Sequence, residues 1–76
     1  MSKPPRVGAV HALAFSLPPT EAAFRTLWPE AEVAHLTDGS LYLDRSKGTA
    51  DEVEIAQRIG RLLNHSEACG ADVIIF

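Results

Sequence analysis

The last seven residues, GADVIIF, constrain the fold more than any other stretch of this sequence. Val73, Ile74, Ile75 and Phe76 follow one another without a polar residue. A run of β-branched and aromatic residues introduced by Gly and Asp predicts a strand, and four apolar residues in succession indicate burial on both faces, as in a parallel sheet. An uncovered strand of this kind invites aggregation. We therefore expect that a partner covers it, or that this chain is a shortened form of a longer one.

The clearest local signal is the helix that precedes this strand. Thr49 and Glu52 match the S/T-x-x-E capping box, and Gly70 is placed to end the helix in a left-handed cap. At roughly 100° per residue the apolar side chains share one stripe, with Glu54 and Arg58 forming an i,i+4 pair on the solvent side. The face predicted to be buried consists of Ile55, Ala56, Ile59, Leu62 and Leu63.

Two more strands and another helix are predicted earlier in the chain. The segment 6–12, RVGAVHA, is apolar and led by Val, which predicts the first strand. Thr20 is expected to cap a helix that Pro29 ends, while 31–36, AEVAHL, predicts the second strand and 37–48 a loop rich in turn residues. The helical side chains expected in the core are Ala23, Phe24, Leu27 and Trp28.

The order strand, helix, strand, helix, strand predicts an α/β fold in which right-handed crossovers build a parallel sheet. Three strands are half of a doubly wound sheet. In the flavodoxin-like order 2-1-3-4-5, the third strand would pair with a fourth that residues 1–76 do not supply. We therefore predict a single incomplete β-α-β-α-β domain, a flavodoxin-like half-domain.

Composition argues against several classes of function. Ten acidic and seven basic residues give a net charge of −3 without a basic cluster, so we expect no nucleic-acid partner. The apolar stretch Val7–Leu17 resembles a signal peptide, but it is interrupted by polar residues and is too short for a membrane span. The chain has no Gly-rich nucleotide motif and lacks the acidic residues of a receiver domain.

The cysteine and histidine content points to a site without metal or cofactor. The single Cys69 excludes an internal disulfide and a CxxC motif, which suits the reducing cytoplasm. Cys69 falls at the end of the second helix, away from the strand carboxyl ends, so we interpret it as structural or incidental. His11, His35 and His65 lack local ligand spacing, and only the fold could gather them into a metal site.

Ligands of open α/β sheets bind beyond the carboxyl ends of the strands, which directs attention to the loops after the first two strands. His11 could orient a substrate or pass protons there, although a hydrogen-bonded structural histidine is the simpler interpretation. Asp38 and Ser40 could bind an amine or a carboxylate. The alternative for these two residues is an Asp-Gly-Ser turn whose side chains bond their own backbone.

Two stretches carry a resemblance to a known family: VGAVHALAFSLPPTEAAFRTLWPEAEVAHLTDGSL, 7–41, and GRLLNHSEACGADVIIF, 60–76. Together they resemble the amino-terminal part of the aspartate/glutamate/hydantoin racemase superfamily, which includes arylmalonate decarboxylases and maleate isomerases. The similarity covers nearly the whole chain but only about the first third of a family member. It rests on HAL, PTEAAFRTLWPEAE and DGSL in that order, followed by GAD and an apolar strand.

The resemblance implies a cofactor-independent enzyme in which two cysteines move a proton at a carbon next to a carboxylate. The first of them usually follows the third strand, a position that Cys69 does not match, so we assign no catalytic residue and expect this chain alone to be inactive. The residues that the resemblance implies for binding the substrate carboxylate are His11, Ala12, Leu13, Asp38 and Ser40.

Two hypotheses from different classes follow. The first is an amino-terminal fragment of a racemase-type isomerase, whose remainder would cover 73–76. The second is a small homodimeric binding or structural module that pairs its exposed strands.

Overall fold

The computed structural model describes residues 3–76. It has three strands, one 3-10 turn and three helices. In chain order these elements are β1 (Arg6–His11), η1 (Ala14–Ser16), α1 (Leu17–Leu27), β2 (Glu32–Thr37), α2 (Gly39–Lys47), α3 (Glu52–Ala68) and β3 (Val73–Ile75).

The three strands form one parallel sheet in the order β2-β1-β3, which confirms the predicted α/β class and the central place of the first strand. The segment Val7 to His11 is buried throughout, because β1 has a strand on each side and α3 packs against it. Small and β-branched side chains suit such a position.

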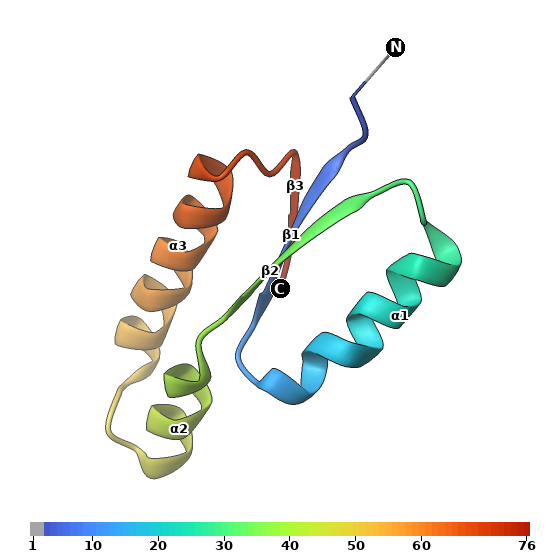
Figure 1. The fold of residues 1–76 in the computed structure, drawn as a ribbon. Helices are drawn as coiled ribbons and strands as arrows, with labels where there is room; N and C mark the ends of the chain where they lie inside the picture. The colour runs from blue at the N-terminus through green and yellow to red at the C-terminus, as the bar shows by residue number, and fades with distance from the viewer. Residues whose placement is uncertain (1–2) are drawn as a thin grey trace.

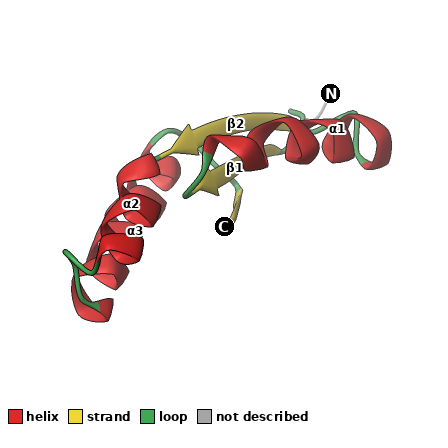
Figure 2. Ribbon diagram, turned by 90° about the horizontal axis from the view of Figure 1, so that it is seen from below, coloured by secondary structure: helices red, strands yellow, loops and turns green. Residues whose placement is uncertain are grey.

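Helices α1 and α3 lie on opposite sides of this sheet (Figure 1). Paired residues in a parallel sheet point to the same face, and the register pairs Ala9 with His35 and Gly8 with Ala34. His35 lines a groove with α1, while a Cβ added at Gly8 would meet Ser66 of α3. Figure 2 shows α2 and α3 together on the side away from α1.

The third strand lies at an edge of the sheet. Val73, Ile75 and Phe76 keep 49%, 38% and 65% of their surface exposed. The prediction of a strand buried on both faces is therefore wrong for residues 3–76, because two of the three residues of β3 are exposed. Within this range β3 also pairs with a strand on only one side. The buried apolar core is correspondingly small, and it comprises Val7, Ala9, Val10, Leu41 and Ile55.

The first helix begins earlier than its predicted cap at Thr20. It starts at Leu17, and prolines occupy the next two positions, where a missing N–H costs nothing and the fixed φ suits a helix. Its end agrees with the prediction, because Trp28 is the C-cap and Pro29 follows. The prediction that four side chains of this helix belong to the core is wrong, because none of them is buried. Leu27 is 82% exposed, Trp28 is 38% exposed, Ala23 is exposed and Phe24 is half-buried.

The loop predicted over 37–48 is instead mostly helix α2. Asp38 caps this helix, accepting a hydrogen bond from the backbone N–H of Ser40 at 3.0 Å. Its buried residue, Leu41, provides the tertiary contact that a short polar helix needs. The turn residues that suggested a loop are therefore helix-capping residues.

The second predicted helix is confirmed as α3, with a corrected start and a narrower buried face. Of the predicted stripe only Ile55 is buried, Ala56 is exposed, and the other three residues are half-buried. Asp51 rather than Thr49 is the N-cap, because its carboxylate accepts from the N–H of Glu54 at 2.8 Å. The C-terminal prediction is right. Gly70 has a φ of +93°, its N–H donates to Glu67, and the N–H of Ala71 donates to Ser66, which is the Schellman pattern.

Candidate functional site

A hollow of about 400 Å³ opens at the carboxyl ends of β1 and β3. This is the edge of a parallel sheet at which α/β proteins bind ligands. The polar part of its wall comes from β1 and from the start of α1, and the apolar part comes from β1 and β3. The lining residues are Val10, His11, Ala12, Ser16, Thr20, Ile75 and Phe76.

The structure brings two of the five predicted site residues into this wall. His11, only 6% exposed, and Ala12 both line the hollow. Leu13 is half-buried and serves as the N-cap of η1, outside the wall. Asp38 and Ser40 lie at the neighbouring carboxyl end of β2, where the Asp38 N–H donates to the His11 carbonyl at 2.9 Å.

Asp38 and Ser40 are engaged with their own turn. The Asp38 carboxylate accepts from both the N–H and the hydroxyl of Ser40. Ser40 also accepts from the guanidinium of Arg58, which reaches across from α3. These contacts support the capping interpretation of the turn over a direct role in binding ligand.

Arg58 does not form the predicted solvent-side pair with Glu54. Its guanidinium lies 2.8 Å from the Asp44 carboxylate, and its side chain is only 17% exposed. The hydrogen bond from Arg58, followed by one from Thr49, holds the pKa of Asp44 below its usual value. Arg58 therefore links α3 to α2 beside the Asp38 turn.

A pair of histidines lies behind the hollow. Nε2 of His11 is 2.9 Å from Nδ1 of His35, and the two rings stack with centroids 5.1 Å apart. Burial, and then the neighbouring His35, lower the pKa of His11. Sequence reasoning missed this pair because the residues stand 24 positions apart, and only the parallel register places them diagonally on one face of the sheet.

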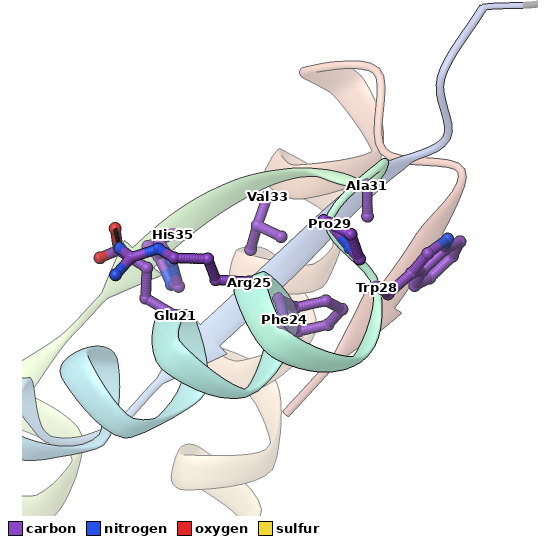
Figure 3. A pocket seen from close by; sticks show the side chains of 8 residues that line it. All are labelled: Glu21, Phe24, Arg25, Trp28, Pro29, Ala31, Val33 and His35. Carbon is purple, nitrogen blue, oxygen red and sulfur yellow. Dashed lines mark hydrogen bonds and ion pairs between the residues drawn. The ribbon is translucent and has the colours of Figure 1, made fainter.

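A second groove, of about 300 Å³, runs between α1 and β2 (Figure 3). Glu21 and Arg25 project from α1 toward the end where His35 lies, and their side chains form an ion pair at 3.0 Å. Phe24 and Trp28 form an aromatic pair with ring centroids 6.2 Å apart. His35 thus borders this groove while it contacts His11, which lines the hollow.

Cys69 lies far from the hollow along the sheet. It is the C-cap of α3, its carbonyl accepts from Arg6 at 3.0 Å, and β3 begins just after it, so it sits at the amino ends of the strands. Its Sγ is exposed and lies 3.5 Å from Nε2 of His65. A thiol in this position cannot reach a ligand held at the opposite edge of the sheet.

Neither a metal centre nor a membrane span was found in the described chain. Across residues 3–76, no group of three His, Cys, Asp or Glu side chains is arranged to hold a metal ion. None of the helices in the same range has both the length and the apolar character needed to cross a bilayer.

Comparison with known proteins gives no match. No protein family, no curated protein and no solved structure is significantly similar to this chain.

Proposed function

We propose that this chain is the amino-terminal part of a cofactor-independent racemase-type enzyme, and that its hollow binds a small carboxylate. The observation that carries the proposal is the position of His11 and Ala12 in a hollow at the carboxyl ends of parallel strands, where sheets of this class bind ligands. The β2-β1-β3 order is also the one expected for the first half of such a domain.

The chemistry of the wall supports a carboxylate. Ser16 and Thr20 supply hydroxyl donors, and His11 supplies an imidazole. The amino end of α1 also lies here, and its dipole favours negative charge. Pro18 and Pro19 remove two of the N–H groups that usually bind anions at a helix start, so side chains carry most of the contact.

Binding without turnover is the expected behaviour. Removing a proton next to a carboxylate requires a base on one face of the carbon and donors for the developing charge. Cys69, the single cysteine, lies at the other end of the sheet. We expect no racemisation of aspartate, glutamate or a 5-substituted hydantoin by this chain, and polarimetry that detects turnover would contradict this part of the proposal.

The binding proposal is tested by titrating the ¹⁵N-labelled chain with L-aspartate and L-glutamate. We expect amide shifts at His11, Ala12, Ser16 and Thr20, with Cys69 unaffected. Thr20→Val keeps the side-chain shape and removes the hydroxyl, so it should weaken binding several-fold. Absence of shifts at millimolar ligand, or shifts confined to the groove beside Trp28, would overturn the proposal.

A second candidate is a self-associating binding or structural module. The observation that favours it is the exposed apolar edge formed by Val73 and Ile75, which offers unpaired backbone groups to another strand. Light scattering distinguishes the two. A defined dimer favours the module, and aggregation or a loosely packed monomer favours a domain that needs its remainder. Either function is proposed for the cytoplasm, in keeping with the single free thiol.

A further inference from the structure

His35 does not line the hollow, but its ring contacts His11, which does. The pair shares one hydrogen bond between Nε2 of His11 and Nδ1 of His35 at 2.9 Å, and which ring donates depends on the tautomers. When both imidazoles are neutral, one hydrogen lies between these two nitrogen atoms. A first added proton strengthens the bond by charge assistance, whereas a second would set two cations in contact. The pair therefore accepts one proton readily.

His11 is the less favourable ring for that proton. His11 is the more deeply buried ring, and burial lowers its pKa by disfavouring the charged form. His35 is half-buried, and it borders the groove that also holds the ion pair between Glu21 and Arg25.

Other charged groups face the pair from the remaining elements. Asp38 follows β2 and is joined to His11 through their backbones. On the α3 side of the sheet, His35 borders a small recess together with Arg6 and His65.

The direction of the hydrogen bond follows from the site of the charge. A protonated His35 donates through Nδ1, so Nε2 of His11 must accept. A neutral His11 then carries its hydrogen on Nδ1, which is the ring nitrogen left to act as a donor. The charge on His35 also favours an anion in the hollow that His11 lines.

We propose that His35 is a proton-linked positioning residue: its protonation fixes His11 as the Nδ1–H tautomer, and a carboxylate that binds in the hollow takes up this proton with it. The coupling to ligand rests on the proposed function, whereas the tautomer of His11 is a property of the free protein. With one proton linked, the affinity rises by at most about tenfold for each pH unit lost.

The free protein provides the first test, by ¹⁵N NMR of the imidazole nitrogens between pH 8 and pH 4.5. We expect His35 to take up the first proton and His11 to change to, or remain in, the Nδ1–H form as it does so. Protonation of His11 before His35, or an Nε2–H form of His11 below the His35 transition, would overturn the proposal whatever the ligand does.

Calorimetry with L-glutamate at pH 5.5 and pH 7.5 provides the second test, because the charge on its carboxylates is constant over this range. We expect tighter binding at the lower pH, with proton uptake detected in buffers of different ionisation enthalpy. His35→Gln retains an amide donor but cannot carry a charge, so it should bind more weakly than wild type at pH 5.5 and take up less proton on binding, while His65→Gln should behave as wild type. If the wild type binds L-glutamate with the same affinity at both pH values, only the coupling between protonation and binding is overturned. No binding at any pH overturns both the coupling and the proposed function.

Discussion

Gly8 of β1 and Ser66 of α3 lie so close that a Cβ added to Gly8 would be 3.0 Å from the Ser66 Cβ. The same atom would be 3.2 Å from the Cβ of Ala71. Helix α3 therefore packs directly on the backbone of the central strand, and a small residue in β1 permits this approach.

Replacing Gly8 by alanine tests this contact. We expect Gly8→Ala to lower the free energy of unfolding by about 1–3 kcal/mol, because the extra methyl group must push α3 outward. Urea denaturation followed by circular dichroism measures the change. The matched control is Gly60→Ala within α3, where a Cβ would meet nothing within 4 Å. It should stabilise the chain by roughly 0.5–1 kcal/mol through helix propensity. Equal effects of the two substitutions would contradict this account.

The start of α3 gives a second prediction. Asp51 caps the helix through the Glu54 N–H, so Asp51→Ala should cost about 1 kcal/mol of stability. Asp51→Asn retains an acceptor and should cost much less. If Thr49 were the true cap, as the capping-box motif predicts, Thr49→Ala would destabilise the chain more than Asp51→Ala does. Thermal unfolding of the two variants measures this difference.

The error at Thr49 shows what local sequence can and cannot specify. The existence of α3 and the left-handed Gly70 were predictable, because they depend on local spacing and on one residue type. The buried face was predicted less well, because of its five residues only Ile55 is buried and Ala56 is exposed. The cap was ambiguous, since both Thr49 and Asp51 carry a suitable oxygen. Tertiary structure decided it, because the hydroxyl of Thr49 is engaged with the Asp44 carboxylate at 3.1 Å.

The candidate site also has features that the sequence predicts and features that only the tertiary structure determines. The carboxyl edge of the sheet and the place of His11 follow from the alternation of strands and helices. The contact between His11 and His35 depends on strand register, which pairs His11 with Thr37 and Ala9 with His35, and no local pattern encodes it. Helix α2 was hidden for a related reason, because Asp38 and Ser40 suit a turn and a helix cap equally well.

The ion pair between α2 and α3 gives a prediction about pH. The pKa of Asp44 is lowered, so as the pH falls the unfolded chain binds a proton at this residue before the folded chain does. The stability that Asp44 contributes is therefore complete above its ordinary pKa of 3.8 and is lost as the pH falls through the lower folded value. We expect the stability difference between wild type and Asp44→Asn to be constant from pH 7 to pH 5 and to shrink below pH 4.

Urea titrations at a series of pH values measure this difference. Glu30→Gln, which removes an exposed carboxylate, serves as the control and should show no comparable pH dependence. Arg58→Gln should reduce the dependence at Asp44, because the Arg58 hydrogen bond is the largest cause of the lowered pKa. A difference between wild type and Asp44→Asn that persists unchanged at pH 2.5 would show that Asp44 acts through shape rather than charge.

The exposed edge of β3 gives the last prediction. Ile75 is 38% exposed beside Val73 and Phe76, and β3 has a strand on only one side within residues 3–76. Apolar side chains next to unpaired backbone groups favour association, and a lysine at such an edge opposes it because its charge would be buried on pairing. We therefore expect Ile75→Lys to lower the mass-average size of the chain in light scattering. Val53→Lys introduces the same charge on α3, at a residue that is 67% exposed, and should leave the size unchanged. A wild-type chain that remains monomeric at every concentration would mean that the edge alone is too short to drive pairing.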